Sequence, residues 1–445
     1  MEGDWMKARF VVSIVLHSLV VAFLANCFVF VRQDLRSLFV CIPLFLIVLF
    51  FAGNFMLKTI RSGVCLHGTV LLYTFCFGLI FSAVYHILLA VYTLPGDHMT
   101  LVWSLVQCAG VLFVVFWVGI LCVYFASAQL GFRLRAIGLA CGLIPIANLV
   151  VLARIINAAT QECLFEIGKE QCNKQRKEEQ ICATRYPILM VHGVFFRDTK
   201  LFNYWGRIPG ELMANGATIF YGNHPSAASI AESAQMLKER IAEILQKTGA
   251  EKVNIIAHSK GGLDCRYAIA HLDIGDRIAS LTTINTPHRG CLFADHLLTK
   301  IPISTQEAVA KSYNTALRRL GEKDADFLAA VNDLTEEHCK ALDGDMPAPK
   351  GIFCQSVGSV LKEAGSGKFP LNFSYLLVKH FSGENDGLVS EDSFAWGEKY
   401  TLLKNENPKG ISHGDMIDLN RENIPDFDVR EFYVRLVQDL KHRGL

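Results

Sequence analysis

Charged residues are scarce in the first third of this 445-residue chain. Between Phe10 and about Ala153 the sequence consists mostly of apolar blocks, and 51% of the whole chain is hydrophobic. From Lys169 onward the composition is that of an ordinary globular protein. The chain also exceeds a single domain of about 100–200 residues. These features disfavour a wholly soluble protein and indicate a membrane part followed by a soluble part.

An excess of charge of either sign is also missing. The net charge is +1, and no segment rich in lysine and arginine is interleaved with aromatic residues. Such segments are typical of surfaces that bind nucleic-acid phosphates. The sequence therefore predicts no nucleic-acid partner, and it implies no oligomeric state.

Cysteine spacing typical of a metal site is absent. Seven of the 14 cysteines precede Ile155 and seven follow it, and no C-x-x-C pair occurs. Cys163, Cys172 and Cys182 are too widely spaced for a zinc site. The seven cysteines of the soluble part cannot all pair. We expect mostly free thiols, no metal and no cofactor, as in a reducing compartment or an organism that makes little use of disulfides.

Long apolar runs are what the first third has instead. A helix needs about 20 apolar residues to cross a hydrocarbon core of about 30 Å. Four blocks meet this length, and a fifth is interrupted by Pro145 and Asn148. The blocks are Phe10–Val31, Leu38–Leu57, Thr69–Tyr92, Leu101–Ala126 and, with the interruptions, Ala136–Ala153. A buried helical core is the alternative, but short charged links between successive blocks argue against it. We predict an all-α transmembrane domain over residues 1–154 with four or five spans.

The role and orientation of this part follow from its few charges. His86 is the main ionisable residue within the blocks, whereas a transporter or proton relay usually needs several. We therefore expect a multi-pass anchor in the cell membrane. With five spans, the flanking lysines and arginines slightly favour an extracytoplasmic soluble domain. With four, that domain would face the cytoplasm. Residues 155–184 are rich in Glu, Lys, Gln and Arg and predict a polar helical linker.

Short apolar runs alternate with helical patterns over residues 185–445. One predicted helix, Ser229–Gln246, carries its apolar residues on one face and is followed by Gly249. The other predicted elements are strands at Tyr186–Val191, Ala217–Tyr221, Val253–Ala257 and Ala279–Ile284 and a helix at Gly262–Leu272. This alternation is typical of an α/β fold, in which helices cover both faces of a mostly parallel sheet.

Residues 257–262 (AHSKGG) connect the third predicted strand to the next helix. A nucleophilic serine on such a strand-to-helix turn needs small residues two positions before and two positions after it, because the turn is very tight. Ala257 and Gly261 meet this need around Ser259. An ordinary turn serine is the alternative, but it does not explain small residues at both positions. Ser259 is therefore the predicted nucleophile.

A nucleophile of this kind is followed in the chain by an acid and then a histidine. Asp386 lies in a polar loop bounded by glycines, and His413 lies in a loop near the C-terminus. His380 precedes the acid and so has the wrong order, His338 lies in a charged helical stretch, and His442 is in the last turn of the chain. We predict that Asp386 orients His413, which accepts the Ser259 proton. The backbone N–H groups of Val194 and Lys260 are the predicted donors to the oxyanion that forms.

Several longer segments carry a family resemblance. YPILMVHG, Tyr204-Trp205, the turn at residues 215–218 (NGAT), EKVNIIAHSKGGLDCRY, TTINTPHRG and GENDGLVS together resemble the bacterial true lipases, which are triacylglycerol lipases with an α/β-hydrolase fold. The resemblance covers the chain from Tyr186 to the C-terminus. It implies Ser259, Asp386 and His413 as a catalytic triad, Val194 and Lys260 as oxyanion positions, and a cap or lid at about residues 292–349.

The chain also departs from that family. Its members are usually secreted without several membrane spans. They often hold a calcium ion near the histidine loop, where Asp415 matches one ligand position, but Lys362–Lys379 contains no aspartate to match the other. We therefore predict no bound metal.

The expected activity is hydrolysis of lipid carboxylic esters at a bilayer, so that a lipid ester is the substrate and the membrane is the partner. A thioesterase, acyltransferase or amidase could share the fold and the three residues. An inactive hydrolase domain that serves membrane assembly is the alternative from another class.

Overall fold

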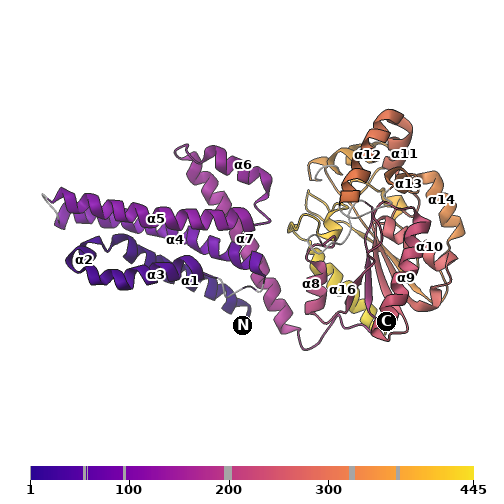
Figure 1. The fold of residues 1–445 in the computed structure, drawn as a ribbon, viewed down its shortest axis with the longest axis horizontal. Helices are drawn as coiled ribbons and strands as arrows, with labels where there is room; N and C mark the ends of the chain where they lie inside the picture. The colour runs from indigo at the N-terminus through magenta and orange to yellow at the C-terminus, as the bar shows by residue number, and fades with distance from the viewer. Residues whose placement is uncertain are drawn as a thin grey trace. The chain divides into compact units, whose positions relative to one another are not determined.

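The computed structural model describes residues 2–53, 57, 59–93, 97–194, 203–319, 326–366 and 371–445. The chain divides into two compact units, Met1–Gln175 and Arg176–Leu445 (Figure 1). We call them the helical unit and the sheet unit. Each has hydrophobic core clusters of its own.

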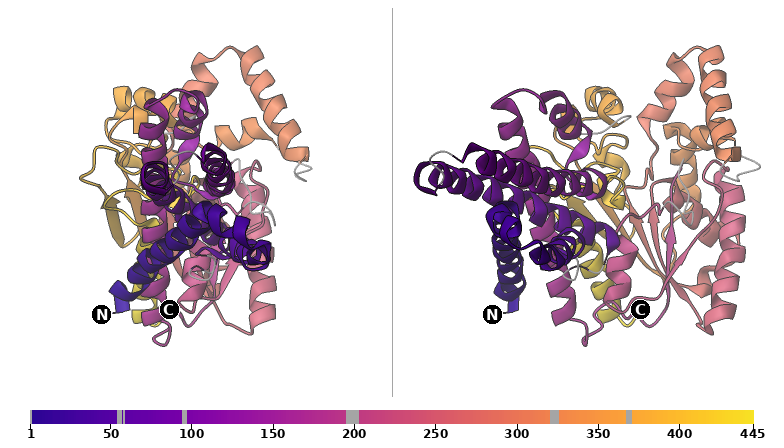
Figure 2. Two further views of the ribbon diagram at one scale, coloured as in Figure 1. Left: turned by 90° about the vertical axis from the view of Figure 1, so that its left-hand side faces the viewer. Right: turned by 60° about the vertical axis from the view of Figure 1, so that its left-hand side comes forward.

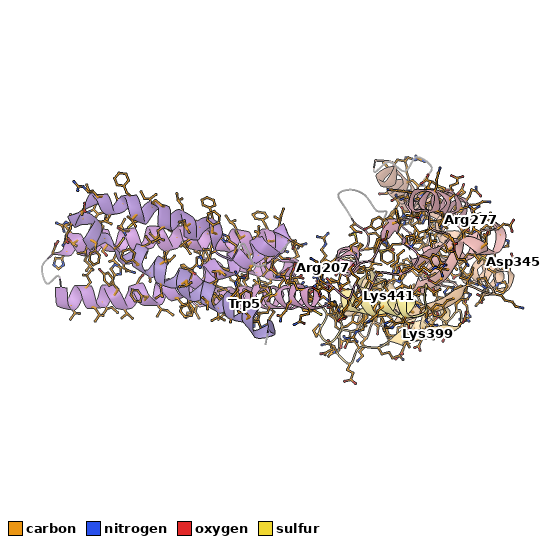
Figure 3. The ribbon with its side chains drawn as sticks, turned by 90° about the horizontal axis from the view of Figure 1, so that it is seen from below. Trp5, Arg207, Arg277, Asp345, Lys399 and Lys441 are labelled. Carbon is orange, nitrogen blue, oxygen red and sulfur yellow. The ribbon has the colours of Figure 1, made fainter. Side chains whose placement is uncertain are left out.

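Helices of very different length build the helical unit. They are α1 (Glu2–Asn26), α2 (Phe28–Gln33), α3 (Leu38–Phe51), α4 (Ile60–Leu88), α5 (His98–Ala126), α6 (Gly131–Cys141) and α7 (Ala147–Gln175). Three stretches of the described chain are long and apolar enough to cross a membrane, namely Trp5–Asn26, Ile60–Val91 and His98–Ala126. Many of the side chains that they project are apolar and exposed, including Trp5, which is labelled in Figure 3. These features are consistent with membrane association.

The other two predicted blocks take different forms. Within the block at Leu38–Leu57, the structure describes the shorter helix α3 (Leu38–Phe51), which contains Pro43, and residues 54–56 of the block lie outside the described residues. The block at Ala136–Ala153 is divided between α6 and α7, with Pro145 in the break. A proline has no N–H to donate within a helix, so a break at this point has a simple cause. The helix α7 then continues to Gln175, through most of the stretch predicted as a linker.

His86, the ionisable residue singled out in the apolar blocks, is buried in α4. Its Nδ1 lies 2.8 Å from the Ser82 carbonyl oxygen, and its Nε2 lies 3.0 Å from Ser104 Oγ on α5. Both ring nitrogens therefore have partners within the unit, and the residue serves to join two long helices.

A sheet lies at the centre of the sheet unit (Figure 2). It has six strands in the order β2-β1-β3-β4-β5-β6, and all neighbours are parallel. The strands are β1 (Ile188–Val191), β2 (Ile219–Tyr221), β3 (Val253–His258), β4 (Ile278–Ile284), β5 (Phe353–Ser359) and β6 (Lys399–Leu403). The first four confirm the predicted α/β fold within a few residues at each end. The last two strands had not been predicted.

Helices cover both faces of this sheet because the strands are apolar on both. Ile188 and Met190 of β1 pack in one core cluster with α16, whereas Leu189 and Val191 pack in another with α9. Successive side chains of a strand point to opposite faces, so a continuous apolar run needs two covers. In Figure 1, α8 (Ile208–Ala214) and α16 (Val429–His442) lie on one side, and α9 (Ile230–Thr248) and α10 (Lys260–His271) lie on the other.

The stretch expected to form a cap is largely helical where it is described. It contains α11 (Leu292–Lys300), α12 (Ile303–Arg319), α13 (Phe327–Asn332) and α14 (Glu336–Asp345). A further helix, α15 (Leu371–Ser382), precedes the loop that holds Asp386. Side chains of α11, α12 and α13 share a small core cluster with Val389 and Phe394.

Candidate active site

Ser259 is the single residue between β3 and α10. Its backbone has φ 55° and ψ −132°, an unfavourable region for any residue with a Cβ atom. Two hydrogen bonds hold the turn: Ser259 N–H donates to the Ile284 carbonyl at 2.9 Å, and Thr286 Oγ1 donates to the Ser259 carbonyl at 2.9 Å. The strained turn is the geometry that a nucleophile elbow requires.

Two glycines allow this turn to pack closely against the loop after β1. A Cβ atom on Gly193 would lie 2.7 Å from Ser259 Cβ, and one on Gly261 would lie 2.4 Å from the His192 carbonyl oxygen. Neither position has room for a larger residue unless the backbone moves. Gly261 is the small residue predicted after Ser259, whereas the role of Gly193 emerges only from the structure.

Asp386 and His413 come from separate loops and meet directly. Asp386 lies between α15 and β6, and His413 lies between β6 and α16. Their side chains approach to 2.6 Å, between Asp386 Oδ2 and His413 Nδ1, and His413 N–H also donates to the Asp386 carbonyl at 2.8 Å. Asp386 is fully buried, and His413 is 8% exposed. The contact fixes both the ring and the backbone of His413.

Three further donors surround the Asp386 carboxylate. The N–H groups of Leu388 and Val389 donate to Oδ1 at 2.9 and 2.8 Å, and Asn285 Nδ2 donates to Oδ2 at 2.6 Å. A buried carboxylate needs such partners, and together they fix its orientation toward His413. Asn285 follows β4 and was not predicted as a site residue, although the segment TTINTPHRG contains it.

His258 connects this pair to Ser259. Its ring centroid lies 4.5 Å from that of His413, and its Nε2 lies 3.2 Å from the His413 carbonyl oxygen. Burial, and then the nearby His413, lower the pKa of His258 well below its usual value. His258 directly precedes Ser259 in the chain, so His413 contacts the residue next to the predicted nucleophile.

The two predicted oxyanion donors lie next to these groups in the chain. Val194 follows Gly193, and Lys260 begins α10 directly after Ser259. Within the described parts of the chain, neither backbone N–H donates to a protein acceptor. The N-terminus of α10 also favours negative charge through the helix dipole. The arrangement could therefore stabilise an anion beside Ser259.

The Lys260 side chain has a separate environment. It is 2% exposed, and its Nζ donates to Asp264 Oδ1 at 2.7 Å and to Ser233 Oγ at 3.2 Å. The other carboxylate oxygen of Asp264 lies 3.6 Å from His224 Nε2. Burial raises the pKa of Asp264 to about 6, although the Lys260 ammonium opposes this shift. The sequence had indicated only a backbone role for Lys260.

This buried ion pair gives a stability prediction. The variant Asp264→Leu leaves the Lys260 ammonium buried without its carboxylate, and we expect a loss of about 3–5 kcal/mol in unfolding free energy. The double variant Lys260→Met/Asp264→Leu removes both charges and should be less destabilised than the single one. Chemical denaturation of the purified proteins in detergent measures both. Equal stability of Asp264→Leu and wild type would contradict the prediction.

The competing histidines lie elsewhere. His338 on α14 is 3.5 Å from Asp333, while His380 on α15 and His442 near the end of α16 are exposed. Among the described residues, none of the three hydrogen-bonds to Asp386.

The side chain of Asp415, which matches a calcium-ligand position of the lipases, forms hydrogen bonds within its own turn. Its Oδ2 accepts the N–H of Ser412 at 2.8 Å and the hydroxyl of Ser412 at 2.7 Å. In the described part of the chain, no group of three His, Cys, Asp or Glu side chains could hold a metal ion. All fourteen cysteines are free thiols in the structure.

Comparisons with known proteins agree with the geometry of the sheet unit. Residues 186–428 match the family model described as the alpha/beta hydrolase fold. The chain is 33% identical to a triacylglycerol lipase of Pseudarthrobacter phenanthrenivorans over 178 residues, which are 37% of this chain and 55% of that protein. It is 28% identical to a triacylglycerol lipase of Pseudomonas fragi over 297 residues, 59% of this chain and 98% of that protein.

The chain thus spans about half the length of the first of these relatives. The crystal structure of Staphylococcus hyicus lipase aligns with a TM-score of 0.46 and 18% identity, covering 58% of this chain and 97% of that one. The family match, over residues 186–428, covers more than half of the chain. This chain belongs to the α/β-hydrolase fold family.

Proposed function

We propose that this protein is a membrane-anchored serine hydrolase that cleaves the carboxylic ester bonds of lipids, as a triacylglycerol lipase does. One observation carries the proposal: His413 contacts the buried Asp386 at 2.6 Å, and its ring packs against His258, the residue before a serine on a strained strand-to-helix turn. Asp386 accepts the Nδ1–H of His413, which leaves the Nε2 lone pair free to take a proton.

The reaction follows from these groups. Ser259 Oγ attacks the ester carbonyl carbon while His413 Nε2 accepts the hydroxyl proton. The N–H groups of Val194 and Lys260 stabilise the oxyanion of the tetrahedral intermediate, an interaction worth about 2.7–4 kcal/mol per donor in the transition state. The intermediate collapses, the alcohol leaves with the proton from His413, and an acyl-enzyme remains. Water activated by His413 then releases the acid and restores Ser259.

The choice of lipid esters has two supports. The relatives that match the sheet unit are named triacylglycerol lipases. The chain also carries three stretches long and apolar enough to cross a membrane, which would keep the enzyme at a lipid surface. A thioesterase, acyltransferase or amidase would use the same three residues, so the activity has to be tested with substrates.

The test combines covalent labelling with a substrate series. A fluorophosphonate should label the full-length protein in detergent, and p-nitrophenyl esters from acetyl to palmitoyl, with emulsified triacylglycerol, should be cleaved. Equal amounts of acyl thioester and acyl amide serve as the competing substrates. A preference for acetyl over octanoyl and longer esters would point to a general carboxylesterase, and faster thioester turnover would point to a thioesterase.

A truncation tests the role of the helical unit. The cut belongs before Arg176, because this guanidinium forms two hydrogen bonds of 2.9 Å to the Glu431 carboxylate within the sheet unit. Residues 176–445 should still hydrolyse short p-nitrophenyl esters. On esters embedded in vesicles they should be about tenfold or more slower than the full chain, because tethering raises the effective concentration at the bilayer. Both rates are measured for both proteins in the presence of the same liposomes. An equal loss on the two substrates would mean that the helical unit is needed for folding and not for substrate delivery.

A further inference from the structure

A buried hydrogen-bonded chain that the proposed reaction does not use runs through the candidate site. Gly193 N–H donates to Tyr204 Oη at 3.0 Å, Tyr204 Oη lies 2.7 Å from His258 Nδ1, and His258 Nε2 lies 3.2 Å from the carbonyl oxygen of His413. Tyr204 is 5% exposed and His258 is 1% exposed, so water does not compete for these bonds.

The two ends of this hydrogen-bonded chain determine where its protons lie. The Gly193 N–H can only donate, and the His413 carbonyl can only accept. Tyr204 Oη therefore accepts from Gly193 and donates its own proton to His258 Nδ1, and His258 carries its proton on Nε2, toward His413. A neutral His258 fits this arrangement, and burial lowers the pKa of this imidazole well below its usual value. Only this one assignment of donors and acceptors gives every polar atom of the hydrogen-bonded chain a partner.

The hydrogen-bonded chain links the backbone segments that carry the groups of the proposed reaction. Gly193 precedes Val194, a proposed oxyanion donor, and His258 precedes the proposed nucleophile Ser259. His413 is the proposed base, and its ring is already held by Asp386. The bonds of Tyr204 and His258 thus set the spacing between three loops that are otherwise far apart in the sequence.

We propose that Tyr204 and His258 are positioning residues, which hold the oxyanion loop, the nucleophile and the base in register. This inference rests on the proposed function. Reacting atoms misplaced by about 1 Å lose about 10²-fold in rate, so small shifts of these loops matter for turnover. This role does not require either side chain to touch the substrate. Breaking these hydrogen bonds should therefore lower kcat much more than it changes KM.

The test starts from Tyr204→Phe, which removes the hydroxyl and keeps the ring contacts with Trp205 and His192. We expect kcat for a p-nitrophenyl ester to fall about 10- to 100-fold, with KM within about threefold and fluorophosphonate labelling slowed to a similar extent as kcat. His258→Phe should have an effect of the same size. The double variant should be no worse than the poorer single one, because both changes break one chain.

Tyr433→Phe is the matched control. Tyr433 is fully buried, its ring contacts Trp205, and its hydroxyl donates to the Met416 carbonyl at 3.0 Å. It should lose thermal stability about as much as Tyr204→Phe while keeping kcat within about threefold. Equal falls of kcat in the two variants would make the effect a general one of buried hydroxyl loss and would overturn the positioning role.

Other outcomes separate this inference from the proposed function. Wild-type kcat and labelling rate in Tyr204→Phe would overturn the positioning role while the hydrolase function stands. A raised KM with unchanged kcat would assign Tyr204 to substrate binding and would also overturn it. A full-length wild-type protein that is neither labelled nor active on any ester would overturn the function and this role with it.

Discussion

Replacing Ser259 with alanine should lower ester hydrolysis by at least about 10³-fold and abolish fluorophosphonate labelling, since loss of the nucleophile in a serine hydrolase costs up to about 10⁶ in kcat. The variant lacks the attacking oxygen, but the interactions that hold the turn remain. The bonds that hold it, from Ser259 N–H to Ile284 and from Thr286 Oγ1 to the Ser259 carbonyl, use backbone atoms that alanine retains. The unfolding midpoint should therefore stay close to that of wild type.

Ser280→Ala is the control for this variant. Ser280 is a fully buried serine of β4, and its hydroxyl donates to Asn254 Oδ1 at 2.7 Å. Its loss should reduce stability modestly, by about 1 kcal/mol, and leave labelling and kcat intact. Residual hydrolysis by Ser259→Ala above about one-thousandth of wild type would exclude Ser259 as the nucleophile.

Asp386→Asn and His413→Ala should each reduce kcat by about 10⁴-fold. Asparagine has one acceptor oxygen, whereas Asp386 uses Oδ1 for two N–H donors and Oδ2 for Asn285 and His413. The side-chain NH2 group of the asparagine must therefore face hydrogen-bond donors on one of its two sides. If the side-chain NH2 group of the asparagine faces His413, Nδ1 of the imidazole must accept a hydrogen bond and the ring proton must lie on Nε2. Nε2 then has no lone pair with which to accept the proton of Ser259.

The histidines outside this arrangement supply the comparison. His338→Ala and His380→Ala should retain kcat within about threefold, because His338 pairs with Asp333 and His380 is exposed on α15. All four variants are assayed with one soluble p-nitrophenyl ester and checked for folding by circular dichroism. An inactive His380→Ala together with an active His413→Ala would show that the base has been assigned to the wrong residue.

The α/β fold of residues 185–445 was predictable because its signal is local. Runs such as those of β1 and β3 are apolar without interruption, and a parallel strand covered on both faces requires that pattern. β5 and β6 lacked it. β5 reads FCQSVGS, with polar residues that bond to neighbouring elements, such as Gln355 to Thr282, and β6 is exposed at its start. Their assignment to the sheet depends on partners far away in the chain.

The helical unit shows a similar limit. Composition was enough to predict apolar blocks, and three stretches have spanning length among the described residues. Composition was not enough to place the helix ends. The block at residues 136–153 is broken around Pro145, and α7 continues as one helix from an apolar start to a polar end at Gln175. Backbone hydrogen bonding, which hydropathy does not describe, determines where a helix is interrupted.

By itself, the sequence determined the candidate nucleophile and the order of the groups around it, because the turn at Ser259 demands small residues at fixed spacing and the acid and histidine follow in the chain. Only the tertiary structure decided which side chains support them. Asn285 on Asp386, Asp264 against the Lys260 ammonium, and Tyr204 between Gly193 and His258 are contacts between separate elements. The physical reason is burial: a polar group removed from water must find a partner, and the packing of the fold determines which residue supplies it.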